Sequence, residues 1–231
     1  KRGPTTPTTC TCTTASPATA AEPPSAWKKS PAANSTGAPA ARSSYRKRRT
    51  MAEALLVVDV QRGFLHPQLP ARNNDGAEEK MQKIMEDFRC SGREIIHIQH
   101  RGTDSSSFFY DEENIRFQSG FEPRVGEKVF TKNVNSAFIG TNLLAYLRER
   151  GIDRLTVMGC TLPHCVSTTV RMAANYGFQV TLVEDACVTF ALSDGAGDFL
   201  SPEMVHLYNI AALRDEFATI VSAQQVLEKY I

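Results

Sequence analysis

Six short apolar runs recur between residues 51 and 231, and each is nearly continuous rather than alternating. A strand that is covered on both faces has this pattern, because neither row of its side chains meets water. We therefore predict six buried, mainly parallel strands. Their ranges are Ala54–Asp59, Glu94–Gln99, Lys128–Thr131, Arg154–Met158, Gln179–Val183 and Phe217–Val221.

The segments between these runs carry apolar residues at helical spacing. Strands that alternate with helices over short connections predict an α/β fold, a Rossmann-like three-layer αβα sandwich around a six-stranded, mainly parallel sheet. The helical positions are Ala77, Met81, Ile84, Met85 and Phe88, then Ile139, Leu143, Leu144 and Leu147, then Val166, Val170 and Ala173, and last Met204, Leu207, Tyr208 and Ala211.

The charge along the chain changes sharply near residue 50. Residues 1–50 hold nine Lys or Arg against one acid, Glu22, although the whole chain has a net charge of only +1. Residues 51–231 are therefore acidic on balance, which argues against a phosphate-binding surface, and we expect no nucleic-acid partner. No apolar run reaches the roughly 18 residues of a transmembrane helix, so we expect no membrane partner either.

Residues 1–50 are rich in Thr, Ala, Pro and Ser, and we expect a disordered basic tail before a single domain over residues 51–231. The acid-poor, hydroxyl-rich composition fits an organellar transit peptide, but it fits a linker or a non-native extension as well. Six cysteines without paired spacing favour a reducing compartment. We expect a cytoplasmic protein, or a mitochondrial or plastid one if the tail is a transit peptide.

Three chemically capable side chains come at or just after strand ends. Asp59 closes the first run, Lys132 follows the third, and Cys165 lies shortly after the fourth. In an open parallel sheet, ligands bind beyond the carboxyl ends of the strands, where the strand order reverses. We expect the three side chains to meet there, although each alone has an ordinary explanation as a cap, a solvated Lys or a small buried Cys.

Cys165 is the best candidate nucleophile among the cysteines of the predicted domain. Pro163 suits the first position of a helix, which places Cys165 in the first turn. The free N–H groups and the dipole of a helix start stabilise a thiolate, and a nearby Lys would lower the thiol pKa further. Cys90 falls at a helix end, where the dipole opposes a thiolate, and Cys160 and Cys187 are not at helix starts.

Several stretches around these residues resemble the isochorismatase-like cysteine hydrolases, in the metal-free branch of the isochorismatase and nicotinamidase superfamily. The resemblance covers residues 51–231 and none of the tail. It rests on three blocks that occur in the family's order at the expected strand ends. The blocks are LVVDVQRGF at 56–64, KNVNSAF at 132–138 and GCTLPHCV at 159–166, followed by VEDAC at 183–187.

The resemblance implies a catalytic triad of Asp59, Lys132 and Cys165. The thiolate would attack the carbonyl of a small amide or carbamoyl compound, and Asp59 would carry the proton to the leaving nitrogen and then activate water. Lys132 would hold the carboxylate and stabilise the thiolate. The family's oxyanion hole maps to the backbone N–H groups of Thr161 and Cys165, with a cis peptide between Cys160 and Thr161. The implied chemistry needs no cofactor.

The stretch after the second strand reads HIQHRGTD at 97–104. Nicotinamidases of the superfamily bind a metal there through an Asp and several His residues, but the Asp-x-His pattern is missing here, so we expect no metal. Three residues are substrate-pocket candidates: Phe64 after the first strand, His100 at the end of the second, and His164 before the candidate nucleophile. Ordinary packing or surface positions are the alternatives.

The 26 residues from Arg101 to Gly126 show little regular pattern, and a stretch of this length in a compact domain is usually functional or interfacial. It contains four phenylalanines that would cover the substrate or pack against a second subunit. Because the family commonly oligomerises, we expect a homo-oligomer. The phenylalanines are Phe108, Phe109, Phe117 and Phe121.

Three alternatives to amide hydrolysis stay open. The first is vinyl-ether hydrolysis of isochorismate, which shares the fold and the acid but generally does not need the thiol. The second is a non-catalytic protein with an inherited fold, which would predict an incomplete site. The third is redox sensing through Cys160 and Cys165, whose positions at a strand–helix junction disfavour a disulfide.

Overall fold

The structure, a computed structural model, describes residues 52–229, so the predictions for residues 1–50 lie outside it. Its centre is a six-stranded sheet in the order β3-β2-β1-β4-β5-β8, and every neighbouring pair is parallel. All six predicted strands are confirmed. Their bounds are β1 Ala52–Val58, β2 Glu94–His100, β3 Lys128–Lys132, β4 Ile152–Cys160, β5 Gln179–Val188 and β8 Thr219–Val221.

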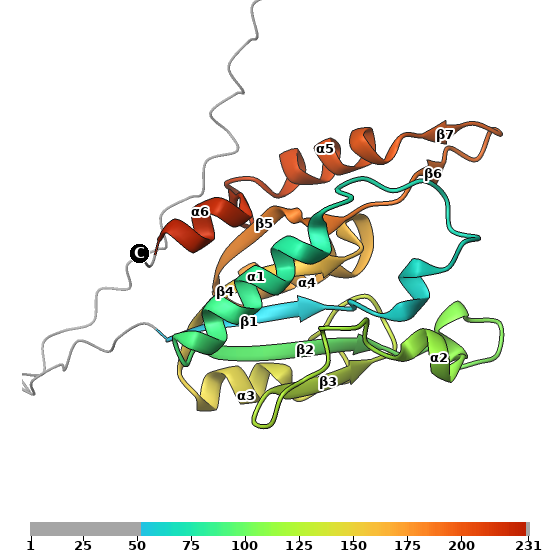
Figure 1. The fold of residues 1–231 in the computed structure, drawn as a ribbon. Helices are drawn as coiled ribbons and strands as arrows, with labels where there is room; N and C mark the ends of the chain where they lie inside the picture. Colours follow the sequence, from blue (N-terminus) through green and yellow to red (C-terminus); the bar gives the residue numbers. More distant parts are fainter. Residues whose placement is uncertain (1–51, 230–231) are drawn as a thin grey trace, which may run out of the picture. The chain divides into compact units, whose positions relative to one another are not determined.

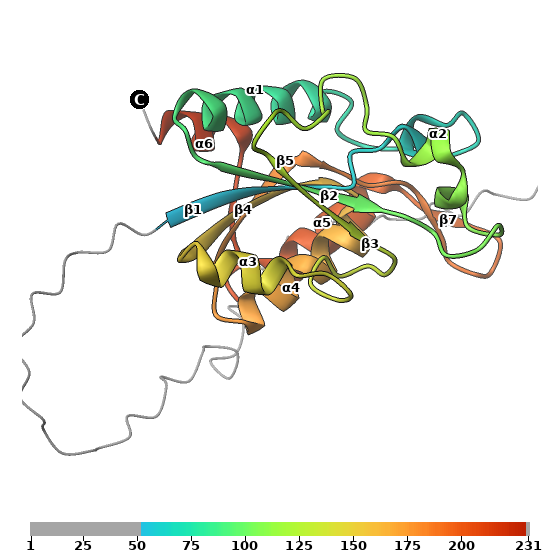
Figure 2. The same cartoon turned by 90° about the horizontal axis from the view of Figure 1, so that it is seen from below.

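Helices cover both faces of the sheet, which confirms the three-layer α/β sandwich. Helices α1 and α6 lie on one face, and α3 and α4 lie on the other (Figure 2). None of the helices in residues 52–229 is both long and apolar enough to cross a bilayer. The bounds are α1 Ala77–Cys90, α2 Glu112–Ile115, α3 Leu143–Glu149, α4 Ser167–Asn175, α5 Pro202–Leu213 and α6 Ala223–Glu228.

The apolar runs form two separate cores because successive side chains of a strand point to opposite faces. In β1, Leu55 and Val57 join the core beneath α1 and α6, whereas Leu56 and Val58 join the core beneath α3, α4 and α5. All four side chains are almost fully buried. A continuous apolar strand is thus needed to fill both layers, which explains the pattern in the sequence.

The strand order reverses between β1 and β4. From β1 the chain adds β2 and β3 on one side of the sheet, and it then crosses back to add β4, β5 and β8 on the other (Figure 1). The carboxyl ends of β1 and β4 therefore border one crevice, where ligands bind in sheets of this kind.

Gly159 allows β1 and β4 to approach closely at this crevice. Its φ is +131°, and a Cβ atom there would lie 2.1 Å from the carbonyl oxygen of Val58. The pairing of β4 with β5 also shifts register between Val157 and Gly159. A side chain at this position would push apart the two strands that carry the candidate site.

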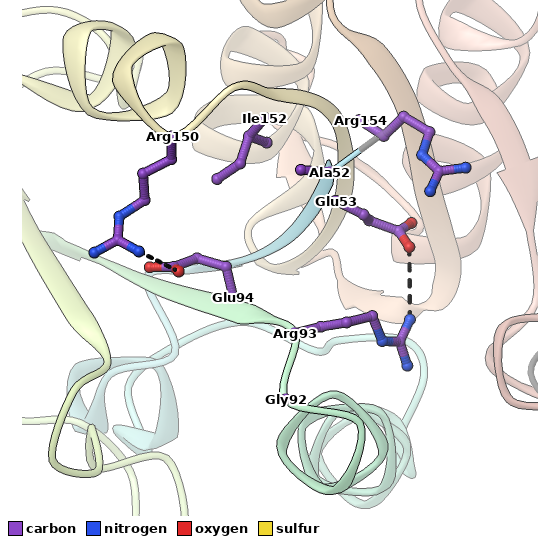
Figure 3. A pocket seen from close by; sticks show the side chains of 8 residues that line it. All are labelled: Ala52, Glu53, Gly92, Arg93, Glu94, Arg150, Ile152 and Arg154. Atoms are coloured by element: carbon purple, nitrogen blue, oxygen red, sulfur yellow. Dashed lines mark hydrogen bonds and ion pairs between the residues drawn. The ribbon is translucent and has the colours of Figure 1, made fainter. Parts of the chain in front are cut away.

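Two ion pairs lie at the amino ends of the strands, opposite the crevice. A pocket of about 350 Å³ lies at the amino ends of β1, β2 and β4. Across it, Arg93 pairs with Glu53 at 3.5 Å and Arg150 pairs with Glu94 at 3.2 Å (Figure 3). The acidic and basic side chains satisfy one another there, and the candidate catalytic residues lie at the other end of the strands.

Two helical predictions differ in detail from the structure. Ile139 precedes α3 and is exposed, so it does not share that helix's buried face. In α5, the predicted apolar positions Met204, Leu207 and Tyr208 are on a helix but face outward. The core side of α5 is made by other residues, namely Pro202, Val205, Ile210 and Leu213.

The stretch from Arg101 to Gly126 contains short helical turns and contributes to the core. Phe121 is buried in the core beneath α1, and Phe117 packs against that core. Phe109 is only partly buried, and its ring lies 4.8 Å from the ring of Phe64. The unpredicted strands β6 Leu192–Ser193 and β7 Phe199–Leu200 form a short antiparallel hairpin before α5.

Candidate active site

Asp59 is held at the end of β1 in a fixed turn. Its φ is +51°, a conformation that Asp tolerates better than most residues, and its N–H donates to the carbonyl of Ile98 in β2 at 2.9 Å. The side chain is fully buried. Its Oδ1 has no hydrogen-bond partner among the described residues. A buried carboxylate oxygen without a partner is costly, so it points to a chemical role.

Lys132 brings the three predicted residues together from the end of β3. Its Nζ lies 2.7 Å from Oδ2 of Asp59 and 3.3 Å from Sγ of Cys165. The Lys132 and Asp59 side chains are both fully buried. The ammonium therefore bridges the carboxylate and the sulfur, as the strand-end positions predict.

Cys165 lies in a π-helical turn, η4 Leu162–Val166, which leads from β4 into α4. Pro163 is near the start of this turn, and the peptide between Cys160 and Thr161 is cis. The residue is 8% exposed. Its sulfur also lies 3.8 Å from Oδ1 of Asn135, a residue that the sequence analysis did not single out.

The electrostatics of the pair differ from the prediction of a resting thiolate. The pKa of the Cys165 thiol is raised to about 12, chiefly by burial and also by the negative charge of Asp59, and Lys132 only partly opposes these two effects. Burial also raises the pKa of Asp59, again opposed by Lys132. The pKa of the Cys165 thiol is thus raised, whereas the sequence analysis expected it to be lowered, and the pKa of the neighbouring Asp59 carboxyl is raised as well.

The turn that carries Cys165 is closed by hydrogen bonds to the carbonyl of Thr161. The N–H groups of His164 and Val166 both donate to the carbonyl of Thr161 at 3.2 Å. Among the turn, loop and cap hydrogen bonds of residues 52–229, the N–H of Thr161 is not a donor. Thr161 directly precedes the turn that carries Cys165. The role of its N–H group in binding an oxyanion stays a prediction.

The structure brings one of the three pocket candidates, His100, into contact with the triad. Nδ1 of His100 lies 3.0 Å from Nζ of Lys132, and the His100 ring is 5.7 Å from that of Phe109. The ring of Phe64 contacts that of Phe109 in a tilted arrangement. His164 is exposed, and its Nδ1 lies 2.9 Å from the hydroxyl of Thr161.

A hollow of about 400 Å³ opens beside Lys132 at this edge of the sheet. None of the three pocket candidates lines it. Its lining residues are Arg101, Gly102, Thr103, Thr131, Lys132, Asn133 and Gly140.

Sequence reasoning missed the role of Gln61, which is fully buried. Its Oε1 accepts the N–H of His100 at 2.8 Å, and its Nε2 donates to the His100 carbonyl at 2.9 Å. A Gln two residues after a strand-end Asp was the only signal, and it fits a loop cap equally well. The partners of Gln61 are set by where β2 ends in space.

A metal ion could be held by only one group of side chains among the described residues: Asp59, His100 and Cys165, whose ligand atoms lie within 4.8 Å of one another. Nζ of Lys132 is within 3.3 Å of an atom of each of them. A cation bound by all three would have to displace this ammonium. The donor set therefore fits Lys132 better than a metal.

The cysteines do not form the pair that redox sensing needs. Cys160 packs in the core beneath α1 and α6, whereas Cys165 packs in the core on the other face of the sheet. The four described cysteines, Cys90, Cys160, Cys165 and Cys187, are free thiols. Because the sheet separates Cys160 from Cys165, these two residues would have to rearrange to form a disulfide.

Comparisons with known proteins agree with the fold and the motifs. The family model described as the isochorismatase domain matches residues 53–225. The uncharacterized isochorismatase family protein YrdC of Bacillus subtilis is 39% identical over 180 residues, which are 78% of this chain and 96% of that protein. Maleamate amidohydrolase of Pseudomonas putida is 29% identical over 75% of this chain and 86% of its own length.

The comparison with solved structures also finds proteins of the isochorismatase family. The crystal structure of a putative hydrolase of the isochorismatase family from Chromobacterium violaceum superposes with a TM-score of 0.73 and 35% identity, over 84% of this chain and 97% of that one. The match of the family model spans the sheet, the helices and every residue of the candidate triad. The chain is therefore a hydrolase that belongs to the isochorismatase family.

Proposed function

We propose that this hydrolase cleaves the C–N bond of a small amide or carbamoyl compound through a thioester on Cys165. One observation carries the proposal: a single buried ammonium, that of Lys132, lies within hydrogen-bond distance of both the Asp59 carboxylate and the Cys165 sulfur. A nucleophile, a base and a cation that holds both in place are what covalent amide hydrolysis needs.

The first half-reaction starts from a neutral thiol. Because burial and Asp59 raise the thiol pKa, the proton stays on sulfur until the substrate arrives. Asp59, whose own pKa is raised, takes this proton as sulfur forms a bond to the carbonyl carbon. The carbonyl electron pair moves to oxygen, which the N–H groups of Thr161 and Cys165 bind. Lys132 keeps its charge throughout, so it stabilises the anion during transfer.

Collapse of the tetrahedral intermediate re-forms the carbonyl and breaks the C–N bond. Asp59 gives the proton to the leaving nitrogen, and an amine or ammonia departs. A water then gives a proton to Asp59 as its oxygen attacks the thioester. The C–S bond breaks, the sulfur recovers the proton from Asp59, and a carboxylic acid is released. Every proton passes through Asp59, which acts as base and then as acid in both halves.

We expect a small substrate because Cys165 is only 8% exposed and because the ring of Phe109 contacts that of His100, which lies against Lys132. A relative that hydrolyses an amide by name, maleamate amidohydrolase, supports this class. The test is ammonia release from a panel of maleamate, nicotinamide, a ureido compound and a carbamoyl amino acid.

The matched variants are Cys165→Ala and Cys160→Ala, since both cysteines are buried near the same peptide. We expect at least one amide to be hydrolysed, loss of turnover in Cys165→Ala, and retention of most turnover in Cys160→Ala. Hydrolysis that survives Cys165→Ala would reject the thioester route.

A second candidate is vinyl-ether hydrolysis of isochorismate, which the description of the matching family model supports. That reaction needs an acid such as Asp59 but no nucleophilic sulfur. Isochorismate is therefore added to the panel with both cysteine variants. Equal isochorismate turnover by wild type and Cys165→Ala, with no amide hydrolysed, would favour this reaction over the first.

A further inference from the structure

Lys132 makes three close polar contacts, and the proposed reaction uses only two of them. An ammonium has three N–H groups. Those of Lys132 point to Oδ2 of Asp59 at 2.7 Å, Nδ1 of His100 at 3.0 Å and Sγ of Cys165 at 3.3 Å. The three acceptors match the three donors, so the ammonium has one preferred orientation.

We infer that His100 is a positioning residue, which acts by accepting the third hydrogen bond of Lys132 and so keeps the ammonium on both the sulfur and the carboxylate. The inference rests on the proposed function of the same site. It goes beyond that function, because the reaction itself routes no proton through His100.

The imidazole must be neutral for this task, with Nδ1 unprotonated and the hydrogen on Nε2. Burial, together with the charge of Lys132, lowers the pKa of His100 to about 4. The ring therefore presents a lone pair to Lys132 at neutral pH. Nδ1 is the only atom of this ring that contacts a side chain of the triad by hydrogen bonding.

The surrounding structure fixes His100 in place. Gln61 binds both its N–H and its carbonyl, as an added rung between the ends of β1 and β2. The Gln61 side-chain amide also donates to the backbone carbonyl of Ile115 at 2.9 Å, and the backbone carbonyl of Gln61 accepts from Nε2 of Gln118 at 3.1 Å. Phe109 covers the His100 ring edge to face. Backbone and ring are both restrained, which is how a fold supports a group that must hold a precise contact.

The test compares His100→Leu, which removes the acceptor, with His100→Asn, which can keep an acceptor oxygen near the position of Nδ1. His97→Asn is the matched control. His97 lies in the same strand and is also buried, but its ring bonds to Glu127 at 2.8 Å, away from the triad. All variants are made in a Cys90→Ser background, because Cys90 is exposed and would react with thiol reagents.

Two readouts are measured: kcat and KM on whichever panel amide is hydrolysed, and the rate of carbamidomethylation of Cys165 by iodoacetamide, followed by peptide mapping. We expect His100→Leu to lower kcat and the alkylation rate about tenfold or more, with little change in KM, because a hydrogen bond to a charged group is lost. His100→Asn should recover most of both rates, and His97→Asn should leave both near wild type.

Equal rates in His100→Leu and wild type would overturn the inference, as would a change confined to KM, which would make His100 a substrate contact instead. If His100→Asn and His100→Leu lower kcat and the alkylation rate to the same extent, His100 has a purely structural role and the inference is overturned. If His100→Leu does not fold, His100→Phe removes the acceptor with a planar ring. The alkylation rate needs no substrate, so the inference can hold or fail independently of amide hydrolysis.

Discussion

At the residue scale, the Asp59–Lys132 pair defines the chemistry of the site. Both side chains are fully buried, and their charges are compensated chiefly by each other. Desolvation makes such a pair costly to form, and even more costly to break by removing one partner. The same burial that raises the thiol pKa thus also makes the fold depend on keeping the ammonium.

A double-variant cycle measures this dependence. Lys132→Met leaves a buried carboxylate without its partner, and we expect it to lower the free energy of unfolding by about 3–5 kcal/mol. Adding Asp59→Asn removes the unpaired charge, so the double variant should be more stable than Lys132→Met alone. Urea unfolding checks both values. A double variant no more stable than the single one would show that the pair is not electrostatically coupled.

Histidines buried in the neutral form make the protein sensitive to acid. Burial lowers the pKa of His100 to about 4 and also lowers that of His97. Between pH 6.5 and 4, the unfolded chain therefore binds more protons than the folded one, and each such proton costs about 1.4 kcal/mol per pH unit. We expect the free energy of unfolding to fall as the pH is lowered through this window.

Chemical denaturation at pH 7, 6, 5 and 4 checks this slope. His100→Asn should flatten it, because one of the titrating groups is gone. Arg89 and His97 hold the pKa of Glu127 at about 2, so loss of that carboxylate's contribution begins only below about pH 4.5. A slope in His100→Asn equal to that of the wild type would contradict the neutral, buried state of the His100 ring, because the raised pKa of Asp59 opposes the histidine slope in both proteins.

At the element scale, the approach of β1 to β4 places Asp59 near the turn that carries Cys165. Gly159 makes this approach possible, both by its positive φ and by the missing Cβ. Gly177, after α4, also has a positive φ, of +85°, but nothing lies within 4 Å of an added Cβ. A substitution at Gly177 therefore tests conformational strain alone, whereas the same substitution at Gly159 adds a steric clash.

We expect Gly177→Ala to cost about 1–2 kcal/mol, the penalty of a left-handed conformation for Ala. Gly159→Ala should cost clearly more or prevent folding, because the β1 backbone must also move. Denaturant midpoints and soluble yields of the two variants give the comparison. Equal costs would mean that the strands have room for a side chain at residue 159.

The main features of the elements could be predicted from the sequence. Continuous apolar runs predict buried parallel strands, and parallel strands bring their carboxyl ends to one edge, so Asp59, Lys132 and Cys165 could be placed together. The role of Gln61 and the direction of the pKa shift of Cys165 could not be predicted from the sequence. The first depends on where the end of β2 lies in space, and the second on the degree of burial, which no local pattern encodes.

At the scale of the whole molecule, one outer surface lacks an apolar partner among residues 52–229. Helix α5 is apolar on both sides: its inner face fills the core, but Leu207 and Tyr208 on its outer face are 69% and 74% exposed. A helix that is hydrophobic all round is usually buried. The apolar surface continues through neighbouring residues of β7 and α5, namely Phe199, Leu200 and Met204.

We propose that this α5–β7 surface contacts a second copy of the chain. A standard interface buries roughly 800 Å² on each partner, and two aromatic side chains of about 150–250 Å² each with three aliphatic ones supply much of such a contact. A two-fold contact places the same surface of the two copies face to face, so the apolar side chains of one copy pack against those of the other. Residues 1–50 are a poorer match, since Trp27 and Tyr45 are their only large apolar side chains.

The oligomeric state tests this surface. We expect light scattering coupled to size exclusion to give a dimer or a larger oligomer for the wild type, and a smaller species for Leu207→Glu. The matched control is Val125→Glu, since Val125 is fully exposed elsewhere on the chain and should not change the mass. A monomeric wild type, or a Leu207→Glu variant with unchanged mass, would contradict the proposed contact.

The central claim is that Cys165 carries the acyl group during turnover. The most direct measurement is peptide mass mapping of the protein, quenched with acid while it hydrolyses the best amide of the panel. We expect an added acyl mass on the peptide that contains Cys165, lost in the Cys165→Ser and Cys165→Ala variants and absent from Cys90, Cys160 and Cys187. Steady amide hydrolysis by Cys165→Ala, or an acyl group carried on another cysteine, would contradict it.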